Sequence, residues 1–283
     1  MSNVLKSWIS RAVIARRLHN ASPLPLDLQK EIVSSLKQLD RLSDRDQPVQ
    51  LMGFKVTYRG ARQLRWLFQE IFVNADYYFE PDNPRPVIVD CGSNIGMSIL
   101  FFKRLYPQSK IIAFEPDPQT FEALRANVRD NALSDVACHQ IALGDFDGNI
   151  DLYQVEDERQ SNLRTSTLHE RMPTKRKISV PVRKLSGFIT ADVDLLKLDV
   201  EGAEVKVLSD LLETGSLRRI KRMHIEYHHH IDRKRDDLSL TLRMLESAGF
   251  GYQFKTHQGS WPGEAEFQDI SIYCYRKSAN LGD

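Results

Sequence analysis

A loop with two glycines is the part of this sequence best suited to binding a ligand through its backbone. Residues 87–89 are Val, Ile and Val, which are typical of a buried parallel strand, and Asp90-Cys-Gly-Ser-Asn-Ile-Gly96 follows them. The periodic apolar run 95–105 then predicts a helix. A strand that enters a helix through such a loop points backbone N–H groups at one spot, which suits an anionic or polar ligand. At Gly92 and Gly96 a ligand could approach the backbone without meeting a side chain.

A carboxylate stands at the end of the next predicted strand. Residues 110–114 are typical of a buried strand, and Glu115 follows them. It lies roughly 20 residues beyond the loop, where nucleoside-binding folds place the carboxylate that holds a ribose. Asp117 is a suitable N-cap, and Pro118 a suitable first residue, for a helix that reaches Asn131. The loop and Glu115 together predict a site for a cofactor that contains a nucleoside.

The sequence of the loop favours S-adenosylmethionine over a dinucleotide. A dinucleotide fingerprint needs the pattern G-x-G-x-x-G, because its second glycine lets the backbone contact a pyrophosphate. Here Asn94 occupies that position. S-adenosylmethionine has no phosphate and presents an amino-acid end and a ribose, so a side chain at this point is tolerated. An NAD-dependent oxidoreductase is therefore a minor alternative.

Composition and charge narrow the class of function. The chain has 283 residues, a net charge of +1 and 41% hydrophobic residues, which suits one large α/β domain with an extension. The near-neutral charge gives no electrostatic footprint for nucleic acid or for an anionic membrane, and we expect no nucleic acid as a partner. No apolar run is long enough to span a bilayer. The cysteines lack disulfide or zinc spacing, which fits a reducing, cytoplasmic setting.

The first twenty residues predict an amphipathic basic helix, with residues such as Trp8 and Ile9 opposite Arg16 and Arg17. One interpretation is a membrane-surface or organelle-targeting role. We favour packing onto the domain, or onto a second copy of the chain in a homo-oligomer formed through the extension.

The order of the predicted elements indicates the fold class. Residues 1–80 predict a helical and mixed extension, with helices over 26–42 and 64–73 and a short strand over 54–58. Residues 81–283 predict a catalytic domain in which strands alternate with helices, as in a doubly wound, mostly parallel seven-stranded α/β sheet. The strands are expected at 87–89, 110–114, 136–142, 195–200, 222–227, 251–255 and 270–275, the last two at the far edge.

The connection between the third and fourth predicted strands is too long for one crossover helix. It contains two alternating runs, 150–152 and 178–182, which predict a β-hairpin inserted at about 146–185. The polar stretch between them, 156–177, has no core pattern and is expected to be a surface loop.

Acidic residues and a histidine end the fourth and fifth predicted strands. Asp199 and Glu201 follow the apolar run 195–198, and Glu226 and His228 end the segment that begins at 222. Because the carboxyl ends of parallel strands share one edge of the sheet, these groups should converge near the glycine loop. Residues 226 and 228 share a face of an extended segment. Together the carboxylates and the imidazole could supply a general base or hold a metal ion.

Five motifs, taken in order, resemble the FkbM-type S-adenosylmethionine-dependent methyltransferases. They are Asp90-Cys-Gly-Ser-Asn-Ile-Gly96, Phe114-Glu-Pro-Asp117, Ala142-Leu-Gly-Asp145, Lys197-Leu-Asp-Val-Glu-Gly-Ala-Glu204 and Glu226-Tyr-His228. The resemblance covers residues 87–275. It implies the class I methyltransferase fold, whose last strand is antiparallel to the rest. It also implies methylation of a hydroxyl on a small molecule, a natural product or a sugar.

The resemblance assigns a role to individual residues. The methionine end of the donor would be held by Asp90, Gly92, Ser93, Asn94 and Gly96. The ribose hydroxyls would be held by Glu115, and Pro116 and Asp199 complete this part of the expected cofactor site. The adenine would lie beside Ala142, Leu143 and Asp145.

A hydroxyl group needs an acceptor for its proton before it can take a methyl group. We expect His228 or Asp199 to be this base, with Glu226 and Glu201 orienting the substrate or the base. A divalent metal is not favoured; were one bound, Asp199 and Glu226 would be its ligands. A three-histidine cluster at 228–230 is disfavoured, because successive side chains of an extended segment point in different directions.

Two other functions stay open on the sequence alone. Enzymes of this class that methylate the amine of a nucleic-acid base carry an Asn- or Asp-Pro-Pro-aromatic segment after the fourth strand, and this chain has Asp199-Val-Glu-Gly202 there. Methylation of a base amine is therefore disfavoured, whereas methylation of RNA ribose is an alternative. The other alternative is a protein that binds the cofactor without catalysis.

Overall fold

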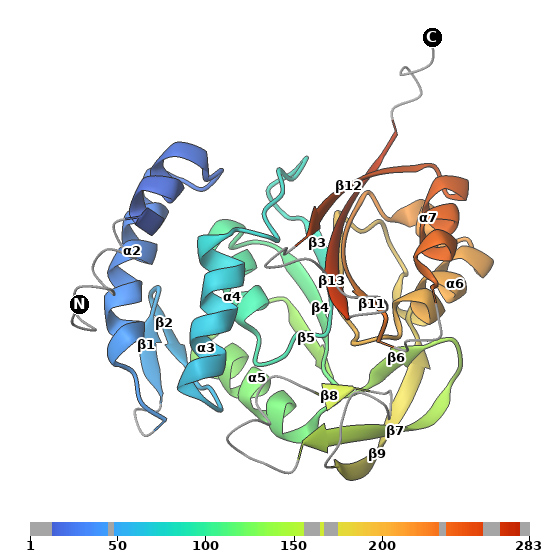
Figure 1. Cartoon of the computed structure of the whole chain (residues 1–283), viewed down its shortest axis with the longest axis horizontal. Coiled ribbons are helices and arrows are strands. Elements are labelled where there is room, and N and C mark those ends of the chain that lie inside the picture. Colours follow the sequence, from blue (N-terminus) through green and yellow to red (C-terminus); the bar gives the residue numbers. More distant parts are fainter. Residues whose placement is uncertain are drawn as a thin grey trace.

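The computed structural model of the chain describes residues 13–44, 48–155, 165–166, 175–231, 236–256 and 267–277 (Figure 1). Residues 13–21 are helical, and the rest of the amphipathic helix predicted for the N-terminus lies outside the described residues. So does most of the surface loop predicted at 156–177. None of the helices in the described part of the chain is long and apolar enough to cross a bilayer.

A seven-stranded sheet forms the centre of the molecule, in the order β12-β13-β11-β10-β3-β4-β5. The five strands from β11 to β5 are parallel, and β13 is antiparallel to both of its neighbours. The bounds are Val87–Cys91 (β3), Lys110–Phe114 (β4), Val136–His139 (β5), Leu195–Leu198 (β10), Arg222–His229 (β11), Phe250–Thr256 (β12) and Gln268–Arg276 (β13). The predicted doubly wound α/β fold with a reversed last strand is confirmed.

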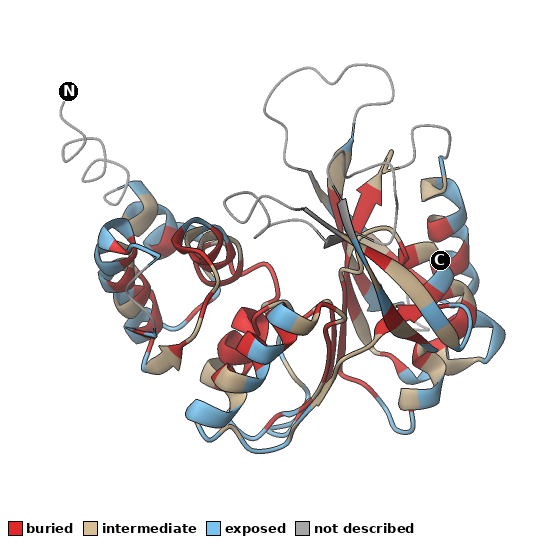
Figure 2. Ribbon diagram, turned by 90° about the horizontal axis from the view of Figure 1, so that it is seen from below, coloured by how far each residue is buried: buried red, intermediate tan, exposed pale blue. Residues whose placement is uncertain are grey.

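Helices cover both faces of this sheet (Figure 1). On one face lie α4 (Met97–Leu105) and α5 (Pro118–Asp130), and on the other α6 (Glu204–Glu213) and α7 (Leu238–Ser247). Asp117 caps α5, as predicted, because its carboxylate accepts the backbone N–H of Thr120 at 2.8 Å. Buried residues form a large hydrophobic cluster on each face, between the sheet and its helices. Figure 2 colours the buried residues red along these strands and helices. Two 3₁₀ turns, Leu185–Phe188 (η4) and Ser216–Arg219 (η5), precede β10 and β11.

The N-terminal segments pack onto the first of these faces. They are α2 (Leu26–Arg41), the antiparallel pair β1 (Val49–Leu51) and β2 (Phe54–Val56), α3 (Ala61–Phe68) and η1 (Gln69–Val73). Their apolar side chains belong to the same buried cluster as those of α4. The side-chain oxygen of Asn127, on α5, also accepts the backbone N–H of Thr57 at 2.6 Å. The extension therefore has no separate core among its described residues.

The helix predicted over 64–73 differs from the structure in one respect. Its second half is a π-helical turn, η1, rather than a continuation of α3. Turns of this kind occur mostly as single insertions in α-helices, often beside functional sites. Glu70 lies in this turn and lines the second of the two cavities described below.

The long connection after β5 forms a second sheet. Its strands are β6 (Ala142–Gly144), β7 (Gly148–Val155), β8 (Thr165–Ser166) and β9 (Lys175–Lys184), in the order β6-β9-β7-β8. The predicted hairpin is present as the antiparallel pair β7–β9. The single strand predicted over 136–142 was wrong, because the chain leaves the central sheet after His139. Residues 142–144 pair instead with residues 182–184 of β9.

Candidate active site

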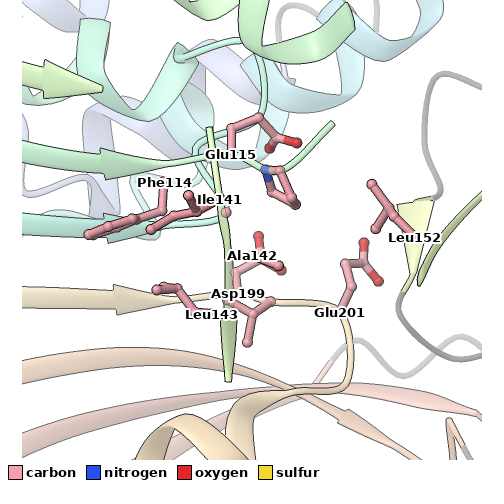
Figure 3. A pocket seen from close by; sticks show the side chains of 11 residues that line it. Phe114, Glu115, Ile141, Ala142, Leu143, Leu152, Asp199 and Glu201 are labelled. Atoms are coloured by element: carbon pink, nitrogen blue, oxygen red, sulfur yellow. The ribbon is translucent and has the colours of Figure 1, made fainter. Parts of the chain in front are cut away.

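A cavity lies at the carboxyl ends of β4 and β10 (Figure 3). The space within it, including the part open to solvent, is about 480 Å³. Glu115, after β4, and Asp199, after β10, lie on opposite sides of it. The rest of the lining is mainly apolar and consists of Gly92, Phe114, Pro116, Ile141, Ala142, Leu143, Leu152, Val200 and Glu201. We call it the first cavity.

A second cavity of about 500 Å³ adjoins the first. It is lined by residues of the glycine loop and of the strand ends, and by residues of the N-terminal extension. They are Trp66, Leu67, Glu70, Ile71, Tyr77, Gly92, Ser93, Asn94, Met97, Ser98, Lys197, Asp199, Glu201 and Glu226. The two cavities have Gly92, Asp199 and Glu201 in common. A ligand that filled the first cavity could therefore extend past these three residues into the second.

Close packing fixes the glycine loop against β10. Gly92 and Gly96 both have φ of 85°, a conformation that side chains rarely adopt. A Cβ on Gly92 would lie 1.8 Å from the carbonyl oxygen of Asp199, and one on Gly96 2.7 Å from Cδ1 of Leu124. The close approach that we expected from a ligand is thus made by the chain itself. This packing holds Asp199 directly beside the loop.

A buried cation holds the Asp199 side chain in place. Lys197 Nζ lies 3.2 Å from the carboxylate of Asp199, 3.4 Å from that of Asp90 and 2.9 Å from the carbonyl oxygen of Gly92. Burial alone would lower the pKa of Lys197, but Asp199 and Asp90 outweigh it and raise this pKa above its usual value. Lys197 therefore stays charged at the junction of the two cavities.

The turn between β10 and α6 is held by Glu204, whose side chain is buried. One carboxylate oxygen, Oε1, accepts the backbone N–H of Gly202 at 3.0 Å and that of Val200 at 3.3 Å. Glu201, in the middle of the turn, has φ of 54°, which is uncommon for a residue other than glycine. Such strain persists where the surroundings enforce it, often at functional sites. Here it directs Glu201 toward both cavities.

His228, on β11, is enclosed by carboxylates. Its Nδ1 lies 2.8 Å from Glu204 Oε1, and its Nε2 lies 3.3 Å from Glu201 and 3.8 Å from Asp199. Burial alone would lower the pKa of His228, but the carboxylates, Glu204 foremost, outweigh it and raise this pKa well above its usual value. Because each ring nitrogen faces a carboxylate, this environment favours the imidazolium form, with both nitrogens protonated.

Two carboxyl groups of the second cavity favour the neutral form. Burial, followed by the charge of Asp199, raises the pKa of Glu70 to about 8. Burial, followed by the charges of Asp199 and Glu70, raises the pKa of Glu226 well above its usual value.

Glu115 links the glycine loop to the end of β4. Its carboxyl oxygens accept the backbone N–H groups of Asn94 at 3.0 Å and of Asp117 at 2.9 Å. Burial raises the pKa of Glu115 to about 8, although these two hydrogen bonds lower it. The carboxyl group is thus oriented at the rim of the first cavity.

Comparison with known proteins decides the family. Residues 90–252, more than half of the chain, match the model of the methyltransferase FkbM domain. The chain belongs to the FkbM methyltransferase family. The matched residues run from the glycine loop into β12. The FkbM domain therefore contains both cavities, except for the part of the second that α3, η1 and Tyr77 supply.

Several curated proteins are similar to this member of the family. "Methyltransferase 1" of Beauveria bassiana is 33% identical over 207 residues, covering 66% of this chain and 81% of the relative. The "31-O-demethyl-FK506 methyltransferase FkbM" of Streptomyces tacrolimicus is 32% identical, covering 62% and 79%. The "2-O-methyltransferase NoeI" of Sinorhizobium fredii is 27% identical, covering 52% and 65%. Among solved structures, an rRNA methylase from Streptococcus thermophilus matches 74% of this chain and 96% of its own at 13% identity, with a TM-score of 0.45.

The FkbM domain brings most of the predicted site residues together. The lining of the two cavities includes Gly92, Ser93, Asn94, Glu115, Pro116, Ala142, Leu143, Asp199, Glu201 and Glu226. His228 contacts the lining residues Asp199 and Glu201. Asp90 and Gly96 lie behind the loop; Asp90 is buried and accepts a hydrogen bond from Ser98 Oγ at 2.5 Å. Asp145 lies in a neighbouring hollow, away from both cavities.

Sequence reasoning gave no role to Glu70, Lys197 or Glu204. For Glu70 and Lys197 the sequence does contain a clue to a special role. Both are charged residues within apolar runs, where burying an unpaired charge is costly. Glu204 begins α6, and reading it as solvent-exposed charge at a helix start would have missed its buried contact with His228.

The described residues include two groups that could hold a metal ion. Asp199, Glu226 and His228 have ligand atoms within 4.8 Å of one another, and so have His229, His230 and Asp236. The second group forms because His230 has φ of 55°, which brings its ring to 3.7 Å from that of His229. For these two histidines the expectation of diverging side chains was wrong. In the first group Lys197 and His228 already compensate the charge of Asp199, which weakens the case for a metal.

Proposed function

We propose that this FkbM-family enzyme transfers a methyl group from S-adenosylmethionine to a hydroxyl oxygen of a small molecule, a natural product or a glycan. The observation that carries the proposal is the junction of the two cavities at Gly92, Asp199 and Glu201. A donor whose nucleoside lay in the first cavity would present its reactive end to whatever occupied the second.

The first cavity fits an adenosine. Its apolar walls, among them Phe114, Ile141 and Leu143, suit a planar base, and Glu115 at the rim offers two carboxyl oxygens for the two ribose hydroxyls. Both carboxyl oxygens already accept backbone N–H groups, which orients them for a further pair of donors. The residues present therefore match the donor that the motifs implied.

The bound donor supplies a methyl group on a positively charged sulfur, which transfers without a covalent enzyme intermediate. The chain has to hold an oxygen in line with that methyl and exclude water. Positioning of this kind contributes about 7–11 kcal/mol, and a general base adds roughly 10²–10⁴-fold. Of our two candidates for the base, His228 is already an imidazolium, so we assign proton acceptance to Asp199. His228 and Lys197 then act as cations that position this carboxylate.

The names of the similar proteins support oxygen as the atom that accepts the methyl group. NoeI is named as a 2-O-methyltransferase, the protein of Streptomyces tacrolimicus as a methyltransferase of 31-O-demethyl-FK506, and AglP of Haloferax volcanii as a hexuronic acid methyltransferase. These acceptors differ widely in shape. In this chain Trp66 and Glu70, which lie outside the matched FkbM domain, line the second cavity and would contribute to the choice of acceptor.

Transfer of radiolabelled methyl from S-adenosylmethionine to a panel of sugar and polyketide alcohols tests the proposal. We expect transfer to one class of alcohol, a thermal shift on adding the donor, and loss of transfer in Asp199→Asn with donor binding retained. Labelling of amines or RNA instead of alcohols would contradict the proposal. Donor binding without transfer to any alcohol would support the non-catalytic alternative.

A further inference from the structure

We propose that His229, His230 and Asp236 form a binding site for a zinc ion, separate from the active site. The bound ion ties the end of β11 to the segment that precedes α7. None of the three residues lines the first or the second cavity. The zinc site therefore does not depend on the proposed methyl transfer.

Two regular elements position the three ligands. His229 is the last residue of β11 and lies opposite Gln268 of β13. His230 follows with φ of 55°, which turns its ring back to 3.7 Å from the ring of His229. Asp236 stands two residues before Leu238, where α7 begins. The ligand atoms of the three side chains lie within 4.8 Å of one another.

The separations between the ligand atoms lie on either side of the value for a zinc site. His230 Nε2 lies 2.6 Å from Asp236 Oδ1, and His229 Nε2 lies 3.9 Å from the same oxygen. Zinc binds nitrogen and carboxylate oxygen at about 2.0–2.2 Å, which places the ligand atoms of a tetrahedral site roughly 3.4 Å apart. Shifts of less than about 1 Å therefore bring these side chains to zinc-binding geometry.

The imidazole of His229 makes no hydrogen bond within the described part of the chain. Its Nδ1 is buried without a partner, and its Nε2 is too far from Asp236 for a hydrogen bond. The side chain is only 16% exposed, so contact with water compensates little of this cost. A zinc ion at Nε2 gives the ring a partner on the side that faces Asp236.

The ligand types select zinc over magnesium or calcium. Two imidazole nitrogens and one carboxylate suit a transition metal, whereas magnesium and calcium take oxygen ligands. Three protein ligands leave the fourth position of a tetrahedral zinc ion to water. His230 also lines the hollow beside Asp145, so the ion lies at the border of that hollow. The side chain of Asp236 is 79% exposed, which gives the ion a path from solvent.

Calorimetric titration of zinc into the full chain, prepared without a polyhistidine tag and stripped of metal, tests the site. We expect one zinc ion per chain, and no competition from magnesium at about thousandfold excess. Cobalt bound in place of zinc should give the visible absorption of a tetrahedral complex. Zinc at about 100 times its Kd should raise the melting temperature by roughly 5 °C.

His230→Asn and Asp236→Asn should each weaken zinc binding by more than about 100-fold and abolish the rise in melting temperature. Asp237→Asn is the matched control, because it removes the same charge from the next residue, whose side chain does not cap α7. It should bind zinc like the wild type. Melting without zinc shows whether each variant is folded. No zinc binding by the wild type, or binding that survives both substitutions, would overturn the inference.

Discussion

His228 Nδ1 lies 2.8 Å from Glu204 Oε1, and the same oxygen accepts the backbone N–H of Gly202. One buried carboxylate thus fixes both the imidazolium on β11 and the strained turn after β10. The turn carries Asp199 and Glu201, so the catalytic edge of the sheet depends on a residue that lines neither the first cavity nor the second.

Glu204→Gln should destabilise the fold by about 3 kcal/mol, because it leaves a buried imidazole without its charged partner. The folded pKa of His228 is raised above the unfolded value of 6.5. Its stabilisation is therefore fully present below pH 6.5 and is lost as the pH rises through the folded pKa. Urea denaturation from pH 6 to 9 should show the gap between wild type and variant narrowing by up to about 1.4 kcal/mol per pH unit.

Glu213→Gln, at the exposed end of the same helix, is the control and should change little. A gap that widened as the pH rose would show that His228 is neutral in the folded protein.

Gly92→Ala should abolish stable folding or cost more than about 3 kcal/mol, because its Cβ would overlap the carbonyl oxygen of Asp199. Gly53→Ala separates this clash from backbone strain. Gly53 has φ of 79°, but nothing lies within 4 Å of its Cβ position, so only about 1 kcal/mol should be lost. Chemical denaturation measures the stability lost in each variant. Equal losses would mean that backbone strain alone explains the cost of Gly92→Ala.

Glu115→Ala should weaken binding of S-adenosylmethionine by about 10–100-fold, the range expected for the loss of two hydrogen bonds. Glu122→Ala, on the exposed face of α5, should bind the donor like the wild type. Calorimetry gives both affinities. Unchanged affinity in Glu115→Ala would place the ribose elsewhere.

The protein without ligand should lose stability between about pH 4.5 and pH 8. Burial raises the folded pKa of Glu115 to about 8 from 4.5. A raised carboxyl pKa gives a contribution that is fully present below about pH 4.5 and is lost as the pH rises toward 8. Glu115→Gln should flatten this decline in urea titrations, and a decline as steep as in the wild type would assign it to other groups.

Methyl transfer should persist in a chelator, because Lys197 and His228 already compensate the charge of Asp199. Assays with excess EDTA and with added magnesium should differ by less than about twofold if no metal takes part. Activity lost in EDTA and restored by magnesium would establish a metal site at Asp199 and Glu226.

Much of the fold could be predicted because strands such as β3 and β10 are short apolar runs that end in functional residues. The residues expected around the cofactor could also be predicted, because the carboxyl ends of parallel strands share one edge of a sheet. The split of 136–142 could not be predicted, because it depends on pairing with β9, some forty residues later. The role of Glu70 could not be predicted either, because the π turn and its approach to Glu226 arise from tertiary packing.

A crystal structure of the wild-type enzyme with S-adenosylhomocysteine tests the central claim most directly. The account predicts the adenosine in the first cavity, its ribose hydroxyls within about 3.2 Å of Glu115, and its sulfur beside Asp199 facing the second cavity. A nucleoside bound outside the first cavity, or a sulfur directed toward the hollow beside Asp145, would contradict it.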